Sequence, residues 1–180
     1  MNRLFIVQFG FWGHWKHSMP QLELNELFPV IDRHIWLNHA AISAWPKPVI
    51  EALSAFVEEN SSLGASQYDQ WMETEDSLRV SIKQLLNADS VDDITLLRNT
   101  SEGLNIIAQG IQWTEGDEIV VFHNEFPSNL LPWLWLRDQG VEVREVHCQT
   151  PEATESLISA LSNQTKLVAV SSVQFDTGIR

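Results

Sequence analysis

The sequence predicts an α/β fold with a mainly parallel sheet and flanking helices. Two observations support this prediction. Short apolar runs alternate with helical segments after residue 90, and turn-forming or helix-capping residues separate them. Strands that alternate with helices form βαβ units on a parallel sheet. The 180 residues are 44% hydrophobic and 19% charged, which is typical of a folded globular protein.

Two amphipathic helices are expected before the sheet. The first begins at Pro48 and extends toward the break at Ser61–Gly64, and the second covers Asp69–Leu86. The elements expected after them are, in chain order, strand Ile94–Leu97, helix Ser101–Ile111, strand Glu118–Phe122, helix Ser128–Gln139, strand Val141–Val146, helix Pro151–Leu161 and strand Leu167–Val173. Gly140 fits a helix stop, and Pro151 fits the first position of a helix.

Charge and cysteine content exclude several classes of protein. The formal net charge is -13, and 11 Lys and Arg residues do not supply the basic patch that nucleic acids or anionic membranes require. No apolar run approaches the roughly 20 residues of a membrane span, and no small-residue cleavage site follows the apolar run Leu4–Trp12. The single cysteine, Cys148, excludes an internal disulfide framework and predicts a reducing, cytoplasmic location.

The segment Asn99–Glu102 follows an apolar run and opens an apolar helix. A helix start has free backbone N–H groups and the positive end of the helix dipole, and Thr100 and Ser101 add hydroxyl groups there. It is therefore a candidate phosphate site. The same segment also fits an ordinary capping box, with Asn99 as the N-cap and Glu102 three residues later. Taken alone, the segment fits both interpretations.

Three loops are expected along one edge of the sheet, because ligands collect where parallel strands end. They are Asn99–Glu102, His123–Ser128 and Gln174–Gly178. The first offers phosphate donors and the second offers the aromatic ring of Phe126. Together these groups suit a planar, phosphorylated cofactor.

Several segments together resemble the class V aminotransferase family, which includes cysteine desulfurases, kynureninase-like enzymes and isopenicillin N epimerase-like proteins. These segments are RNTSEGLN, GDEIVV, EFPSNLLPW and TKLVAVSSVQFDTG, in this order, preceded by WLNHAAISAWPKPVIEAL from Trp36. The resemblance implies the fold type I large domain that binds pyridoxal 5'-phosphate (PLP). It divides the chain into an N-terminal arm of residues 1–35 and a partial PLP-binding domain of residues 36–180, truncated before the last strands and the C-terminal small domain.

The resemblance also assigns roles to individual residues. Thr100 and Ser101 match the pair that binds the cofactor phosphate, and Phe126 matches the residue that stacks on the pyridine ring. Gln174 lies near the position that contacts the ring hydroxyl, where desulfurases have Asn at or next to it. The residues that match the segment lining the substrate side are Asn38, His39 and Ala40. Desulfurases have His at the position of Phe126, so the resemblance favours a relative other than a typical desulfurase.

The resemblance further predicts that the chain lacks catalytic residues. PLP chemistry needs a lysine that binds the cofactor covalently and a carboxylate at the pyridine nitrogen, and in the family both follow the segment that ends at Arg180. Lys166 opens a strand at the end away from the loops. We therefore expect the chain to be part of a PLP-dependent enzyme that acts on an amino acid or a small amine, and to be inactive alone. The alternative is a non-catalytic module completed by a partner chain. Complete relatives are usually homodimers, and the reaction type stays open.

Two further expectations concern stability and metals. In the family, the strand at Ile94–Leu97 pairs with a strand that this chain lacks, so we expect the isolated chain to be marginally folded or prone to aggregation. His14 and His17 have helical spacing, but no further ligand cluster accompanies them, so we expect no metal site. The G-x-S-x-G, Walker and G-x-G-x-x-G motifs are absent.

Overall fold

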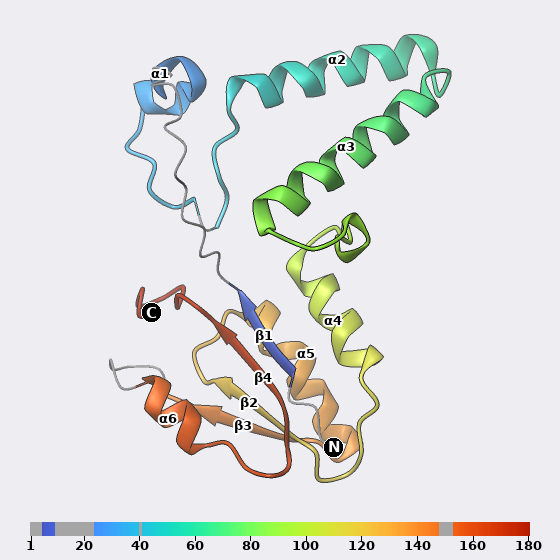
Figure 1. Cartoon of the computed structure of the whole chain (residues 1–180). Helices are drawn as coiled ribbons and strands as arrows, with labels where there is room; N and C mark the ends of the chain where they lie inside the picture. The colour runs from blue at the N-terminus through green and yellow to red at the C-terminus, as the bar shows by residue number, and fades with distance from the viewer. Residues whose placement is uncertain (1–4, 10–23, 40, 148–152) are drawn as a thin grey trace. The chain divides into compact units, whose positions relative to one another are not determined.

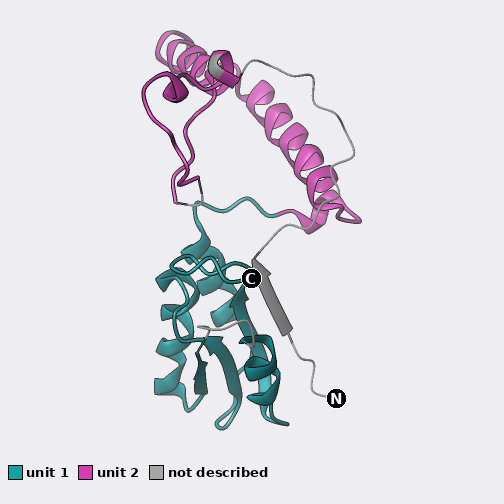
Figure 2. Ribbon diagram, turned by 90° about the vertical axis from the view of Figure 1, so that its left-hand side faces the viewer, with its two compact units in different colours: residues 1–12, 95–180 teal, residues 13–94 magenta. Residues whose placement is uncertain are grey.

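The chain forms two compact units, one of residues 1–12 and 95–180 and one of residues 13–94 (Figure 2). The computed structural model describes residues 5–9, 24–39, 41–147 and 153–180. We call the first unit the sheet unit and the second the helical unit. The boundary expected between an arm of residues 1–35 and a large domain of residues 36–180 stays a prediction.

The described part of the sheet unit contains a four-stranded sheet in which all neighbouring strands are parallel, in the order β1-β4-β2-β3 (Figure 1). Its strands are β1 (Phe5–Phe9), β2 (Glu118–Phe122), β3 (Glu142–Val146) and β4 (Thr165–Ser171). Ile119 lies in register with Val143 on one side and with Leu167 on the other. The carboxyl ends of parallel strands meet along one edge of a sheet. The predicted α/β fold with a parallel sheet is confirmed.

Helices flank this sheet close to their predicted positions (Figure 1). α4 (Thr100–Gly110) precedes β2, and α6 (Ala153–Ser159) precedes β4. The helix predicted over residues 128–139 is present as three short pieces, namely the 3₁₀ turn η3 (Pro127–Asn129), α5 (Leu131–Leu134) and the 3₁₀ helix η4 (Trp135–Gln139). Pro132 has no backbone N–H, so one bond of a continuous helix cannot form. Gly140 ends the segment with a φ of 81°, which confirms the predicted helix stop.

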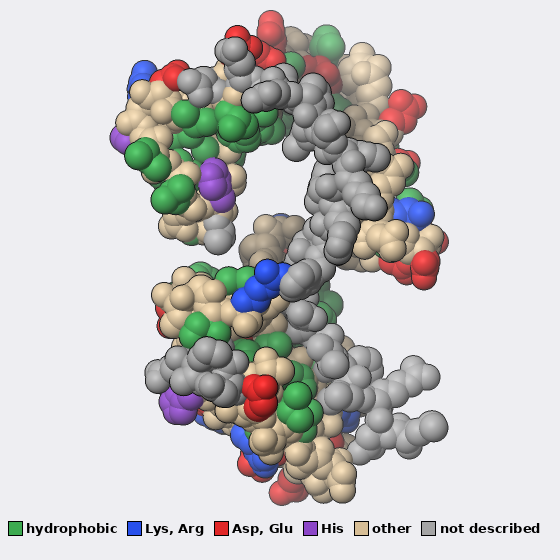
Figure 3. Space-filling model, turned by 60° about the vertical axis from the view of Figure 1, so that its left-hand side comes forward, with side chains coloured by type: hydrophobic (Ala, Val, Ile, Leu, Met, Phe, Trp, Pro, Cys, Tyr) green, Lys and Arg blue, Asp and Glu red, His purple; other side chains and the backbone are tan. Residues whose placement is uncertain are grey.

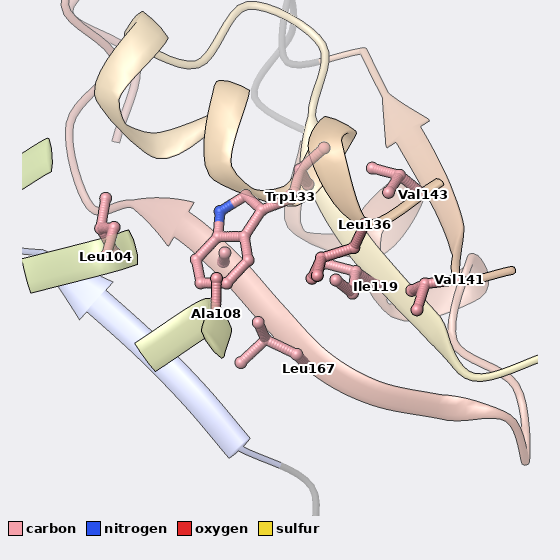
Figure 4. Close-up of a cluster of buried hydrophobic side chains, with 10 residues drawn as sticks. Leu104, Ala108, Ile119, Trp133, Leu136, Val141, Val143 and Leu167 are labelled. Atoms are coloured by element: carbon pink, nitrogen blue, oxygen red, sulfur yellow. The ribbon is translucent and has the colours of Figure 1, made fainter. Parts of the chain in front are cut away.

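Trp133 is the largest fully buried side chain of the main core. Its indole lies among side chains from α4, η4 and the sheet (Figure 4). The cluster consists of Leu104, Ala108, Ile119, Val121, Trp133, Leu136, Val141, Val143, Leu167 and Ala169. A second, smaller cluster contains Phe122 and Ala153. Side chains alternate between the two faces of a strand, so α4 and η4 cover one face of β2, and α6 covers the other.

The helical unit exposes much of its apolar surface. Its described elements are α1 (Leu24–Leu27), η1 (Pro29–Asp32), α2 (Lys47–Leu63), α3 (Tyr68–Leu86) and η2 (Val91–Asp93). α2 and α3 confirm the two predicted helices, yet neither contains a buried residue, and hydrophobic side chains reach the surface (Figure 3). Trp71 joins the two helices, because its ring lies 5.3 Å from that of Phe56 and its Nε1 donates to Glu59 Oε1 at 2.8 Å. None of the helices described is long and apolar enough to cross a membrane.

The predicted strand Ile94–Leu97 is wrong. These residues form no strand, because none of the strands described pairs with them. Ile94 is nevertheless buried, and its carbonyl accepts a hydrogen bond from Arg79 Nη1 at 2.5 Å. A strand that the sequence did not predict, β1, pairs instead with β4, with Phe5 opposite Leu167. Marginal stability of the isolated chain stays a prediction, although the unpaired strand that motivated it is absent from this structure.

Replacing Trp133 with alanine should destabilise the sheet unit strongly. The change removes a fully buried indole and leaves a cavity between α4 and the sheet, for which a cost of about 3–5 kcal/mol is expected. The matched control is Trp135→Ala, because Trp135 is 74% exposed and its loss should cost less than about 0.5 kcal/mol. Urea unfolding monitored by far-UV circular dichroism measures both. Equal losses in the two variants would contradict the assigned core.

Candidate functional site

The first turn of α4 carries backbone N–H groups without partners. Asn99 caps this helix, because its Oδ1 accepts the Glu102 N–H at 2.9 Å and its carbonyl accepts the Gly103 N–H. The N–H groups of Thr100 and Ser101 bond to no other described residue. Both residues are exposed. The helix start therefore combines two free donors with the positive end of the helix dipole.

Glu102 does not complete the reciprocal capping box that the sequence suggested. Its carboxylate accepts the backbone N–H of Arg98 at 2.8 Å, one residue before the N-cap, and pairs with the Arg98 guanidinium at 2.7 Å. Side-chain and backbone hydrogen bonds from Arg98 hold the pKa of the Glu102 carboxyl below its ordinary value. Arg98 thus neutralises the one carboxylate in the first turn of α4, which would otherwise repel an anion.

Ser101 connects α4 to the loop that follows β2. Its hydroxyl donates to Ser128 Oγ at 2.9 Å. A cavity of about 320 Å³ lies beside this pair. It is lined by Ser101, Asn105, Pro127, Ser128, Leu131, Pro132 and Trp135. Hydroxyl groups and apolar walls therefore meet at one place, as in small-molecule pockets.

The loops after β2 and β4 are held together by three consecutive contacts. Asn124 Nδ2 donates to Asp176 Oδ1 at 3.1 Å, and the Phe126 and Phe175 rings lie 5.2 Å apart at 89°. Between these contacts, Gln174 Nε2 donates to Glu125 Oε1 at 3.1 Å. The three predicted loops are thus brought together, the first to the second through Ser101 and the second to the third through these contacts.

Phe126 and Gln174 differ sharply in exposure. The Phe126 side chain is 51% exposed, whereas Gln174 is 2% exposed. Gln174 Oε1 and Asn129 Nδ2 are buried and have no hydrogen-bond partner among the residues described. One buried acceptor and one buried donor therefore stay unpaired in the segments that follow β2 and β4, which is uncommon in folded proteins.

The predicted substrate-side residues belong to the helical unit. Asn38 and His39 are exposed there, and His39 Nδ1 lies 3.2 Å from Ser43 Oγ. Ala40 lies outside the described residues. The substrate-side assignment of Asn38, His39 and Ala40 stays a prediction, as does the cofactor assignment of the residues in the sheet unit.

Lys166 lies at the amino end of β4, as the sequence predicted. Its Nζ bonds to Asp117 Oδ2 at 2.7 Å and to the Gln112 carbonyl at 2.5 Å, and it lies 5.6 Å from the centroid of the Trp113 ring. Phe126 lies in the loop that follows the carboxyl end of β2. Lys166 and Phe126 are therefore at opposite ends of the sheet, and the Lys166 amine is not available at the loops.

His123, near the edge of the sheet, contacts two neighbouring side chains. His123 Nδ1 lies 2.8 Å from Glu145 Oε2, and its ring lies 4.9 Å from that of His147. Hydrogen bonding from His123, with a further contribution from Arg137, holds the pKa of Glu145 below its ordinary value. No group of three or more potential metal ligands occurs among the residues that the structure describes. His14, His17 and Cys148 lie outside the described residues.

Comparison with known proteins identifies the family of the chain. Residues 35–180 match the family described as aminotransferase class-V. The chain belongs to the class V aminotransferase family. The match begins one residue before Trp36, where the resemblance of the sequence to this family also begins, so the predicted family is confirmed.

The class V relatives include cysteine desulfurases. A probable cysteine desulfurase of Methanothermobacter thermautotrophicus is 33% identical over 151 residues, which cover 81% of this chain and 38% of that protein. A cysteine desulfurase of Salmonella newport is 29% identical over 179 residues and is covered to 42% of its length. The chain therefore spans less than half the length of these relatives.

Solved structures share the fold. The apo structure of cysteine desulfurase from Thermococcus onnurineus NA1 aligns with a TM-score of 0.68 at 26% identity, covering 88% of this chain and 42% of that chain. The complex of the cystine C-S lyase C-DES with cysteine persulfide gives a TM-score of 0.73 at 24% identity, covering 84% of this chain and 42% of that chain. A C-DES mutant structure holds glycine covalently linked to its PLP cofactor. The fold is thus one that carries PLP in a structural neighbour.

Sequence reasoning missed three residues of this region. Ser128 was only the end of a predicted loop, and Glu125 and Asp176 had no assigned role as partners of the other loop. Each makes its contact across more than 25 positions in the chain. The local signal that could have marked Glu125 is a carboxylate directly before an aromatic residue at the end of an apolar strand.

The Lys166–Asp117 pair predicts a pH-dependent contribution to stability. Burial raises the pKa of Asp117, but hydrogen bonds from Lys166 and Thr114 lower it to below its ordinary value. Asp117→Asn should therefore cost about 1–2 kcal/mol at neutral pH. This difference should be complete above the ordinary aspartate pKa of about 4 and vanish as the pH falls through the lower folded-state value.

Urea unfolding of wild type and Asp117→Asn between neutral and acidic pH measures this difference. Asp138→Asn is the control, because Asp138 is exposed and its substitution should change stability by less than about 0.5 kcal/mol. A difference for Asp117→Asn that grew with acidification would contradict the assignment.

Proposed function

We propose that the sheet unit binds PLP at the edge where β2 and β4 end, with the phosphate at the start of α4 and the pyridine ring beside Phe126. The chain thereby supplies part of the cofactor site of a class V enzyme that acts on an amino acid or a small amine. The observation that carries this proposal is the pair of free N–H groups at Thr100 and Ser101, joined through Ser128 to the loop of Phe126.

The start of α4 suits a phosphate dianion. Its donors are the N–H groups of Thr100 and Ser101 and the Thr100 hydroxyl. The Ser101 hydroxyl can donate to a phosphate in place of Ser128 Oγ. Backbone donors and the helix dipole together favour a phosphate at such a position. The ion pair between Arg98 and Glu102 reduces the negative charge beside it.

The loop after β2 suits a flat aromatic ligand. Phe126 is half exposed, and its perpendicular contact with Phe175 leaves at least one face of its ring uncovered by that partner. Stacking on such a face is favourable for a pyridine ring. Because Gln174 Nε2 is used by Glu125, Gln174 Oε1 is left as an acceptor for a ring hydroxyl.

The residues of the sheet unit orient this cofactor and do not attach it. Bound PLP stabilises negative charge that develops on an amine substrate, and its covalent attachment requires a lysine amine. Residues 1–12 and 95–180 contain one lysine, Lys166, and it is paired with Asp117 at the other end of the sheet. A lysine that attaches the cofactor must therefore come from outside these residues, and the second candidate function is a non-catalytic binding module whose site a partner chain completes.

The chain should bind PLP through its phosphate. Quenching of tryptophan fluorescence during titration measures the affinity. Thr100→Ala combined with Ser101→Ala should weaken PLP binding about tenfold, because two hydroxyl contacts to an anion are lost. Pyridoxal, which has no phosphate, should bind wild type and variant equally weakly. Ser159→Ala in α6, whose hydroxyl bonds to the Glu155 carbonyl, is the control and should bind PLP like wild type. Equal binding of PLP and pyridoxal by wild type would refute the phosphate site.

Borohydride reduction should leave PLP unattached to Lys166. The Lys166 amine is held by Asp117 and the Gln112 carbonyl, so it cannot reach a cofactor bound near Phe126. Mass spectrometry of the reduced complex tests this expectation, and a peptide containing Lys166 with the mass of the reduced adduct would show that the cofactor binds elsewhere. Lys166→Arg should bind PLP as tightly as wild type.

A further inference from the structure

We propose that Glu125 is a positioning residue that fixes the Phe126 ring by tying the loop after β4 to the loop after β2. This inference rests on the proposed function, because its consequence for ligands is the presentation of a flat ring to PLP. Glu125 itself is not expected to touch the cofactor.

The Glu125 carboxylate is buried and accepts three hydrogen bonds from the last residue of β4 and from the loop after it. Its relative exposure is 4%. Oε1 accepts the Ser171 N–H at 2.6 Å and Gln174 Nε2 at 3.1 Å, while Oε2 accepts the Ser171 hydroxyl at 2.6 Å. A carboxylate can stay buried when several donors bind it. Three hydrogen bonds therefore tie one residue after β2 to two positions at the end of β4.

The polarity of this network is fixed by chemistry. An ionised carboxylate only accepts hydrogen bonds, so the Gln174 amide must turn its nitrogen toward Glu125. The amide oxygen, which lacks a partner among the residues described, is left on the other side. Glu125 thus determines which atom of Gln174 remains available.

Burial does not fix the two phenylalanine rings next to these buried groups. Phe126 follows Glu125 directly and is 51% exposed, and Phe175 follows Gln174 directly and is 61% exposed. Their perpendicular contact at 5.2 Å is the only ring contact that either residue makes among the residues described. Core packing does not constrain half-exposed rings, so their orientation depends on backbone anchored at Glu125 and Gln174.

Glu125→Leu tests this inference because it removes every acceptor of the network while keeping a side chain of similar volume. The Ser171 N–H, the Ser171 hydroxyl and Gln174 Nε2 then lose this partner. Glu125→Gln is the matched conservative variant, because its amide oxygen can take the place of Oε1 and its amide nitrogen can donate to the Ser171 hydroxyl, which reverses its direction. A role that depended on side-chain volume alone would be kept by Glu125→Leu as well.

The first measurement needs no ligand. In wild type labelled with ¹³C-phenylalanine, nuclear Overhauser effects should connect the rings of Phe126 and Phe175. These signals should disappear in Glu125→Leu and be retained in Glu125→Gln. Ring contacts that persist in Glu125→Leu would overturn the inference, whether or not the chain binds PLP.

The second measurement is PLP affinity by tryptophan fluorescence. Glu125→Leu should bind about tenfold more weakly, and Glu125→Gln should stay within about threefold of wild type. The control is Glu142→Gln, because the Glu142 side chain is 67% exposed and its loss should leave affinity unchanged. If wild type fails to bind PLP, the proposed function fails, and the ring contacts still decide the inference.

A milder variant covers the case in which Glu125→Leu does not fold. Ser171→Ala removes the hydroxyl donor to Oε2 and keeps the backbone bond to Oε1. Weaker ring contacts and PLP affinity reduced about threefold are expected. Wild-type values for both quantities in folded Ser171→Ala would count against the positioning role of Glu125.

Discussion

Parallel pairing of β2, β3 and β4 is the constraint on which the remaining structure depends. It brings the end of β2 and the end of β4 to one edge, so residues 46 positions apart in sequence become neighbours. The core side chains of β2 alternate with side chains on the opposite face, and this alternation gives α4 and α6 separate surfaces to cover.

The two ends of this sheet differ in how completely their polar groups are paired. At the amino end, Glu118 is buried and bonds to Arg144, Thr165 and Ser162, while Asp117 binds Lys166. The polar groups at the amino end therefore bind one another through hydrogen bonds and ion pairs, which stabilise the fold. At the other end, the N–H groups that begin α4, one amide oxygen and one amide nitrogen have no partner among the residues described. Unpaired hydrogen-bonding groups are thus found where the strands end.

Local sequence signals predicted much of this arrangement. Alternation of apolar runs with helical segments predicted the sheet, and Asn99 predicted the cap of α4, because both depend on near neighbours. The predicted strand at Ile94–Leu97 was wrong, since a β-strand needs a partner strand that local sequence does not specify. Glu125 was missed for a related reason: its burial depends on donors that only the pairing of β2 with β4 brings close.

The helix over residues 128–139 shows an intermediate case. Its position and its stop at Gly140 followed from the sequence, but its division into short pieces depends on Pro132 and on the packing of Trp133 against the sheet. The family was recognised from the combination of segments, whereas the positioning network was not visible in any single motif. Tertiary contacts therefore determine the details that matter most for presentation of Phe126.

The most direct test of the proposed cofactor site is a map of amide chemical-shift changes in the ¹⁵N-labelled chain on addition of PLP. Binding at the sheet edge predicts the largest changes at the N–H groups of Thr100 and Ser101, with further changes at Phe126. Changes concentrated around Lys166 and Trp113, at the opposite end of the sheet, would contradict it.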